Sequence, residues 1–204
     1  MKLKALTLIS GGIDSPVASY VLREYEQIPA YFDNFPFAGE DTKQRALDSM
    51  KALGFKTAYV LPHGQNLAEF ARNCDRKFQC VLCRRMMFRA ASALAERVGC
   101  DFIITGENLA QVASQTIQNI YTESSASSKP IIRPLIGLDK EDIIKIAKDI
   151  GTYDISVRPA ACCMIVPKKP ATKSRLERIV AEEAKVNLHE LVEKTLHNAK
   201  KVDL

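Results

Sequence analysis

The stretch LISGGIDSP at residues 8–16 decides the fold, because it joins a short apolar run to a helix-like segment. Residues 4–9 read as a buried strand, and residues 16–25 carry apolar side chains at helical spacing. Two glycines let the backbone approach a ligand closely. Free N–H groups at the start of the helix, with the hydroxyls of Ser10 and Ser15, suit phosphate oxygens. The stretch therefore predicts a strand, a phosphate-binding loop and a helix, although a ligand-free glycine turn has the same local pattern.

Strand-like and helix-like segments alternate beyond this loop. Further strands are predicted at residues 27–32, 56–61 and 101–105, and helices at 41–53, 67–73, 84–98, 140–150, 173–184 and 188–198, with another beginning within 111–118. Strands separated by helices of this length need crossover connections, so the sequence predicts an α/β fold with a doubly wound parallel sheet. We expect residues 1–155 to form this domain and residues 156–204 to form a basic helical extension packed on it. Ligands of such sheets bind at the carboxyl ends of the strands.

The composition is that of an ordinary globular protein. Of the 204 residues, 47% are hydrophobic and 26% are charged, which excludes a mainly disordered chain. The chain shows neither an apolar run long enough for a membrane span nor a signal peptide, so we expect a cytoplasmic protein without a membrane partner. The net charge of +5 permits a polyanionic partner without proving one.

The phosphate loop also resembles a known family signature. It lacks the G-K-[ST] of a Walker A motif and the spacing of G-x-G-x-x-G, but it is similar to the SGGxDS signature of the PP-loop ATP pyrophosphatases. The resemblance implies an adenine nucleotide alpha hydrolase-like fold and cleavage of ATP between its α and β phosphates. It implies that Ser10, Gly11, Gly12 and Ser15 hold pyrophosphate and that Asp14 acts near Mg²⁺.

Four more strings, in order along the chain, narrow the resemblance. They are RRMM at residues 84–87, TGEN at 105–108 with QVASQT at 111–116, RPLIGLDK at 133–140, and the cysteine pair 162–163 followed by PKKPAT at 167–172. Together with the loop, residues 4–175 look like the catalytic domain of the tRNA 4-thiouridine synthase (ThiI) family. The resemblance implies an ATP-dependent tRNA sulfurtransferase that adenylates a uridine and replaces its oxygen with sulfur.

The resemblance also implies a set of nucleotide contacts. The expected adenosine and phosphate contacts are Leu8, Ile9, Tyr31, Phe32, Arg84, Gly106 and Gln115. The physical properties agree, because strand-end backbone groups can read an adenine edge and a guanidinium binds phosphate. Lys140 matches a family lysine and is expected to contact phosphates as part of the catalytic group. Taken singly, Arg84 and Gln115 are ordinary surface residues, and Lys140 is an ordinary first-turn residue.

Six cysteines in a chain of this kind suggest thiol or metal chemistry rather than a disulfide framework. Cys163 aligns with the family cysteine implicated in sulfur transfer. Cys80 and Cys83 form a C-x-x-C that resembles archaeal-type members, in which such a pair joins a third cysteine to hold an iron–sulfur cluster. The expected ligands are thus Cys80, Cys83 and Cys163, with Cys162 as the rival third ligand.

Other readings of the cysteines stay open. A zinc site would want four ligands and would add Cys74 or Cys162. A redox disulfide between Cys80 and Cys83 is another, since a C-x-x-C before a helix has a lowered thiol pKa. Purely structural cysteines are a third, and Cys100 fits that reading. The three histidines do not have the spacing of a metal site. His63 follows the end of a predicted strand, and no role is assigned to it.

The resemblance leaves the partners open as well. The family's N-terminal RNA-binding regions and its C-terminal rhodanese domain have no counterpart in these 204 residues. We therefore expect a stand-alone, archaeal-like form that binds tRNA with a separate RNA-binding subunit or as a homodimer, and an external sulfur donor of unknown identity. Basic residues Lys168, Lys169, Lys173, Arg175 and Arg178 are candidates for phosphate contacts. Two alternatives are a PP-loop enzyme that adenylates a small molecule and a non-catalytic subunit that binds ATP or a cluster.

Overall fold

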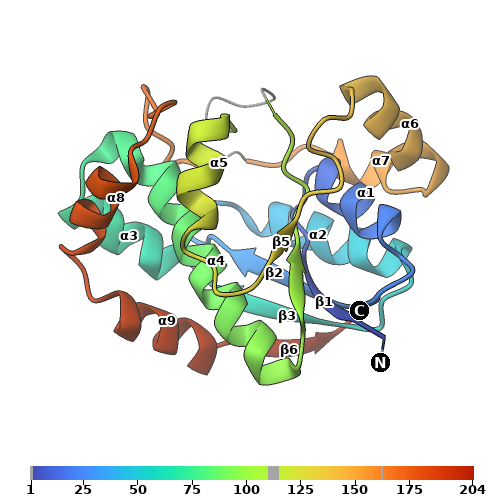
Figure 1. Cartoon of the computed structure of the whole chain (residues 1–204). Helices are drawn as coiled ribbons and strands as arrows, with labels where there is room; N and C mark the ends of the chain where they lie inside the picture. Colours follow the sequence, from blue (N-terminus) through green and yellow to red (C-terminus); the bar gives the residue numbers. More distant parts are fainter. Residues whose placement is uncertain (1, 110–114, 162) are drawn as a thin grey trace.

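The computed structural model describes residues 2–109, 115–161 and 163–204 (Figure 1). Its strands are β1 (Lys4–Leu8), β2 (Glu26–Asp33), β3 (Thr57–Pro62), β4 (Phe102–Ile104), β5 (Ile131–Ile132) and β6 (Lys200–Asp203). Its helices are α1 (Asp14–Val21), α2 (Glu40–Ala52), α3 (Gly64–Asn73), the 3₁₀ turn η1 (Arg76–Phe78), α4 (Gln79–Val98), α5 (Ile117–Ser124), α6 (Lys140–Asp149), α7 (Tyr153–Ser156), α8 (Leu176–Glu183) and α9 (Leu188–His197).

The strands form one sheet in the order β5-β4-β1-β2-β3-β6. Every neighbouring pair is parallel except β3 and β6, which are antiparallel. The predicted α/β fold with a doubly wound, largely parallel sheet is confirmed. Because β1 to β4 run in the same direction, their carboxyl ends meet at one edge of the sheet, where ligands of such folds bind.

Helices cover both faces of the sheet (Figure 1). On one face, Leu6 and Phe32 of the strands pack with Phe88 and Leu94 of α4 and with Leu196 of α9. The other face is covered by α1, α2 and α6. Neighbouring β1 residues, Ala5 and Leu6, belong to opposite faces, as the alternation of side chains along a strand requires. The sheet is therefore buried on both sides, which leaves its edges and strand ends for function.

The long helix α4 begins at Gln79 rather than at the predicted Arg84. A 3₁₀ turn precedes it, and the Asp75 carboxylate accepts a hydrogen bond of 3.1 Å from the Lys77 N–H there. The helix ends at Gly99, whose φ of 70° suits a residue without a side chain. The earlier start places Cys80 and Cys83 on the first turns of the helix instead of in the segment before it.

Other predicted boundaries also shift. The helix expected to begin within residues 111–118 is α5, which starts at Ile117, and residues 110–114 lie outside the described residues. Asp139 precedes α6, but its side chain makes no capping hydrogen bond. The last 49 residues hold helices and also β6, a strand that the sequence analysis did not predict. None of the helices described for the chain is both long and apolar enough to cross a bilayer.

Candidate functional site

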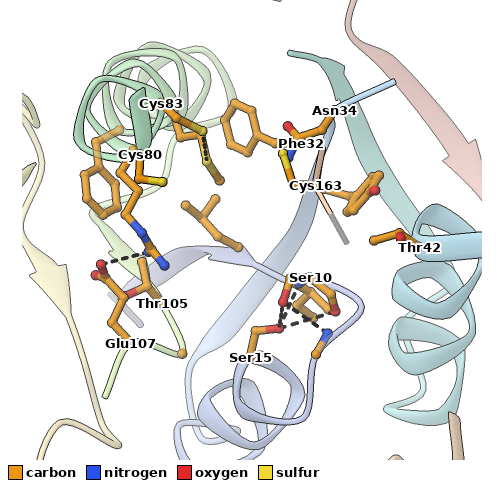
Figure 2. A pocket seen from close by; sticks show the side chains of 18 of the residues that line it. Ser10, Ser15, Phe32, Asn34, Thr42, Cys80, Cys83, Thr105, Glu107 and Cys163 are labelled. Atoms are coloured by element: carbon orange, nitrogen blue, oxygen red, sulfur yellow. Dashed lines mark hydrogen bonds and ion pairs between the residues drawn. The ribbon is translucent and has the colours of Figure 1, made fainter. Parts of the chain in front are cut away.

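A cavity of about 380 Å³ opens at the carboxyl ends of the central strands (Figure 2). The phosphate loop forms one end of it, and the first turns of α4 form the other. Eleven of the predicted nucleotide and phosphate residues line it, namely Leu8, Ile9, Ser10, Gly12, Asp14, Ser15, Tyr31, Phe32, Arg84, Gly106 and Gln115. The cysteines Cys80, Cys83 and Cys163 line it as well. The topology thus brings together residues that are far apart in the sequence.

The phosphate loop is held by its own hydroxyls. The Ser15 hydroxyl oxygen accepts a hydrogen bond of 2.8 Å from the Ser10 N–H and lies 3.0 Å from the Ser10 hydroxyl. The Gly12 N–H donates to that same Ser10 hydroxyl at 3.3 Å. At Gly106 a side chain would have no room, since its Cβ would lie 2.5 Å from the Ser15 nitrogen. The β4 end therefore presses against the start of α1 and keeps the loop in place.

Asp14 and Lys140 meet at the edge of this loop. The Lys140 ammonium, on the first residue of α6, lies 2.5 Å from a carboxylate oxygen of Asp14. Lys140 itself does not line the cavity, and neither does Gly11, which packs against the Thr42 carbonyl of α2. A carboxylate and an ammonium beside a phosphate loop provide one ligand for a cation and one cation for phosphate.

The strand ends form an apolar wall with a few polar atoms. Tyr31 and Phe32 are buried at the end of β2, and burial raises the pKa of the Tyr31 phenol, so that it stays protonated. Two cavity-lining amides, Asn34 and Gln79, each keep a buried oxygen that accepts no hydrogen bond from the described residues. The wall itself is therefore mainly apolar, as expected for a pocket that holds a flat ring.

Three cysteines line the cavity, two from α4 and one from a separate loop. Cys80 and Cys83 project from α4, and Cys163 approaches from a loop whose Met164 N–H donates to the Phe37 carbonyl at 2.8 Å (Figure 2). Cys80, Cys83 and Cys163 are all free thiols. Cys162 lies outside the described residues.

The thiol pKa values of Cys80 and Cys83 differ from those expected of a redox motif. Burial raises the pKa of both Cys80 and Cys83, with Arg84 acting in the opposite direction. The expectation of a lowered thiol pKa was wrong, because the pair lies on a packed helix rather than before it. Among residues 2–109, 115–161 and 163–204, no three His, Cys, Asp or Glu side chains are grouped closely enough to hold a metal ion.

A buried charge network lies under Arg84. Its guanidinium is 2.8 Å from one oxygen of Glu107, while Arg133 donates to the other oxygen at 2.7 Å. Thr105 donates to that second oxygen at 3.0 Å. Burial acts to raise the pKa of Glu107, but Arg84 and Arg133 outweigh it and hold the pKa below its usual value. Glu107 therefore fixes the direction in which Arg84 enters the cavity.

A second carboxyl, Glu123 of α5, is fully buried in the same network. Neither of its oxygens has a hydrogen-bond partner of good geometry among the described residues, and the Arg84 guanidinium lies 4.0 Å from one of them. Burial, opposed by Arg84 and increased by the charge of Glu107, raises the pKa of Glu123 to about 8. The network thus holds two arginines, one charged carboxylate and one carboxyl that keeps its proton at neutral pH.

The sequence analysis did not identify this network as a unit. Glu107 lies in TGEN and Arg133 in RPLIGLDK, so both strings were noticed, but only for their resemblance to a family. Glu123 carried no signal, because it lies in a stretch with no predicted function. Tertiary structure brings the four charged groups together. They come from α4, from α5, and from the segments that follow β4 and β5.

Known proteins are similar to this chain in both sequence and structure. A family model described as thiamine biosynthesis protein (ThiI) matches residues 1–188. A probable tRNA sulfurtransferase of Methanosarcina mazei is 43% identical over 209 residues, which cover 98% of this chain and 52% of that protein. Its counterpart in Methanosarcina acetivorans is 44% identical over 195 residues, covering 92% and 47%.

A solved structure is also similar over almost the whole chain. It is the crystal structure of a 4-thiouridine synthetase–RNA complex with bound ATP, with a TM-score of 0.92 and 35% identity. The match covers 98% of this chain and 55% of the other. The chain spans about half the length of the curated relatives that it matches.

Proposed function

The chain belongs to the family described as thiamine biosynthesis protein (ThiI), and from this premise we propose that it adenylates a tRNA uridine with ATP and replaces the uridine oxygen with sulfur. One observation carries the proposal: Cys80, Cys83 and Cys163 line the same cavity as the phosphate loop. A site for ATP cleavage and a site for sulfur chemistry are therefore within reach of one bound base.

The first half of the reaction would take place at the phosphate loop. The uridine oxygen attacks the α-phosphorus of ATP, a new oxygen–phosphorus bond forms, and the bond to pyrophosphate breaks. The N–H groups and hydroxyls of Ser10, Gly12 and Ser15 would receive the leaving pyrophosphate, whose charge they stabilise. Lys140 would contribute a positive charge at the same end of the cavity.

Mg²⁺ is the expected cation of this step. It prefers octahedral oxygen ligands and is usually bound through one or two carboxylates together with substrate phosphates. Asp14 is placed for that role, because its carboxylate lines the cavity at the phosphate loop, and the cation would share it with Lys140. Both oxygens of Glu107, in contrast, are engaged by arginines. Asp14 would thus hold Mg²⁺, which when bound neutralises charge on the phosphates.

The second half would take place beside the cysteines. A sulfur nucleophile attacks the activated carbon of the base, the new carbon–sulfur bond forms, and AMP leaves with the former uridine oxygen. Cys163 would be the catalytic cysteine of this step, and Arg84, which Glu107 orients, would face the departing AMP phosphate.

An iron–sulfur cluster is the finer proposal for this site. Thiolates are the ligands that such clusters prefer, and Cys80, Cys83 and Cys163 line one cavity. Among the described residues these thiols are not grouped closely enough to bind a metal ion, so cluster binding would require the Cys163 loop to approach α4. Cys80, Cys83 and Cys163 would hold the cluster, with Cys162 as the rival to Cys163. When bound, the cluster would bring sulfur chemistry next to the activated base.

The RNA would reach the cavity past an exposed basic segment. Cys163, Ile165 and Val166 line the cavity, and the exposed side chains of Lys168, Lys169, Lys173, Arg175 and Arg178 follow directly in the sequence. Lysines and arginines at the mouth of a cavity suit RNA phosphates. A homodimer or a separate RNA-binding subunit would enlarge this surface.

The test is a reaction under anaerobic conditions. The purified protein is incubated with ATP, Mg²⁺, sulfide and unmodified tRNA, and the digested nucleosides are examined by mass spectrometry. Formation of 4-thiouridine together with AMP and pyrophosphate is the expected result. Pyrophosphate release with a small metabolite but not with tRNA would instead favour a small-molecule enzyme. ATP binding without any turnover would favour a non-catalytic subunit.

A further inference from the structure

His63 is a fully buried histidine that the proposed reaction does not use. It lies between β3 and α3, and its backbone N–H donates to the Asp33 carbonyl at 2.7 Å. Its ring lies edge-on to Phe32, with centroids 5.5 Å apart and planes at 79°. Its Nε2 atom is 3.3 Å from the sulfur of Cys83. The ring therefore contacts both Phe32 of the strand-end wall and the Cys83 sulfur.

A chain of side chains determines which ring nitrogen carries the proton. The Thr195 hydroxyl donates to the Leu191 carbonyl at 2.8 Å, so its oxygen is left to accept a hydrogen bond of 2.9 Å from the Asn66 amide nitrogen. The same amide nitrogen lies 3.1 Å from Nδ1 of His63. Because an amide NH₂ group only donates, Nδ1 must be the acceptor and the proton of the neutral ring must be on Nε2.

The ring is held neutral by its surroundings. Because Nδ1 accepts a hydrogen bond from Asn66, it carries no proton, and the fully buried ring is uncharged. The group that faces the Cys83 sulfur is thus a neutral N–H donor, not a cation. The Cys83 S–H in turn donates to the Met87 sulfur at 4.0 Å. Such donors orient a sulfur atom and stabilise its negative charge, in thiolates as in metal-bound thiolates.

We propose that His63 is a positioning residue for Cys83, and that Asn66 and Thr195 fix the tautomer in which Nε2–H donates a hydrogen bond to the Cys83 sulfur. The hydrogen bond would distinguish Cys83 from Cys80, for which no such donor is described. Its importance for sulfur transfer rests on the proposed function, but the hydrogen bond itself can be tested without ATP, RNA or a cluster.

The first measurement reads the tautomer directly. Long-range ¹H–¹⁵N correlation spectra of the reduced, metal-free protein separate the two ring nitrogens of each histidine. We expect His63 to show a protonated Nε2 and an unprotonated Nδ1. In Asn66→Leu, which lacks the amide donor, we expect a mixture of tautomers. A wild-type ring protonated on Nδ1 would overturn the proposal.

The second measurement tests the reactivity of the Cys83 sulfur. The alkylation rates of Cys83 and Cys80 by iodoacetamide are followed by peptide mass spectrometry at a fixed pH. Loss of one hydrogen bond to the thiolate should slow Cys83 by about threefold to fivefold in His63→Leu, and by less in Asn66→Leu. His63→Gln, which retains an N–H donor, should recover most of the rate. The rate of Cys80 should stay constant.

Controls separate this hydrogen bond from a folding defect and from the proposed reaction. His189→Gln changes an exposed histidine and should leave both rates as in the wild type. Thermal unfolding identifies any variant that does not fold, and Asn66→Leu keeps the test valid if His63→Leu is one of them. Equal Cys83 rates in all folded variants would contradict the proposal. If the alkylation rates are as predicted but no 4-thiouridine forms, the proposed function is refuted and the proposed hydrogen bond is not.

Discussion

The two ends of the cavity are built in different ways. The phosphate loop is a continuous segment, in which Ser10 and Ser15 hold each other, and close contacts with Gly106 and Thr42 support the loop from outside. The cysteine end is assembled from α4, a loop near the C-terminal helices, and buried charges on three other elements. The first depends on local sequence, and the second on the packing of the whole domain. Substitutions should therefore separate the two ends.

The largest expected effect is on the phosphate end. Asp14→Ala removes the carboxylate proposed to hold Mg²⁺, and we expect pyrophosphate release to fall about a thousandfold. The cysteine end should be unaffected, so the alkylation rates of its thiols should be as in the wild type. The matched control is Asp149→Ala, an exposed aspartate at the end of α6. A similar loss in both variants, or altered thiol rates in Asp14→Ala, would show that the two ends are not separable.

The reciprocal substitution is Cys163→Ser. A serine hydroxyl is a far weaker nucleophile and a poor soft-metal ligand, so 4-thiouridine formation should fall about a hundredfold. Pyrophosphate release with tRNA should continue, because the phosphate loop is unchanged. Nucleoside mass spectrometry and a pyrophosphate assay on the same samples give both readouts. Undiminished thiolation would exclude Cys163 as the catalytic cysteine and leave Cys162 as the candidate.

The buried charges beneath the cysteine end should show in the pH dependence of stability. Because the pKa of Glu123 is raised to about 8, the folded protein holds a proton that the unfolded chain releases above its ordinary pKa. Stability is therefore lost as pH rises towards 8. Glu123→Gln does not titrate, so at pH 9 we expect it to be more stable than the wild type by roughly 2 kcal/mol.

The measurement is urea unfolding of both proteins at pH 5 and pH 9. The exposed Glu177→Gln of α8 serves as the control and should follow the wild type at both values. A Glu123→Gln variant that is less stable than the wild type at pH 9 would mean that Arg84 stabilises the ionised form of Glu123. The network would then hold two charged carboxylates at neutral pH.

The smallest expected effect concerns the mouth of the cavity. Lys168→Ala and Lys169→Ala should each weaken tRNA binding severalfold and lower the slope of log K against log salt by roughly one unit per lost phosphate contact. Lys51→Ala changes an exposed lysine of α2 and should alter neither the affinity nor the salt slope. Filter binding over a range of salt concentrations measures both. An unchanged slope would place the RNA elsewhere on the molecule.

The same contrast explains what the sequence could predict. The phosphate loop, the four central strands and the helices between them depend on local patterns, and their order was predicted, although α4 begins five residues earlier and α1 ends four residues earlier than expected. β5 has two residues and β6 reads Lys-Lys-Val-Asp, so neither carries a strand pattern. The contact of His63 with Cys83 and the pairing of Glu107 with Arg84 and Arg133 depend on tertiary packing. No periodicity records such contacts.

The edges of the sheet bear on how copies of this protein can associate. β5 offers only two residues, and β6 presents exposed lysines and an aspartate along a four-residue strand. Extension of a sheet by a second molecule needs a long, flat edge, and edge lysines oppose it. Strand-to-strand polymerisation is thereby disfavoured at both ends. A dimer that presents two cavities to one RNA would have to form through helices or loops, where its geometry is independent of the register of the sheet.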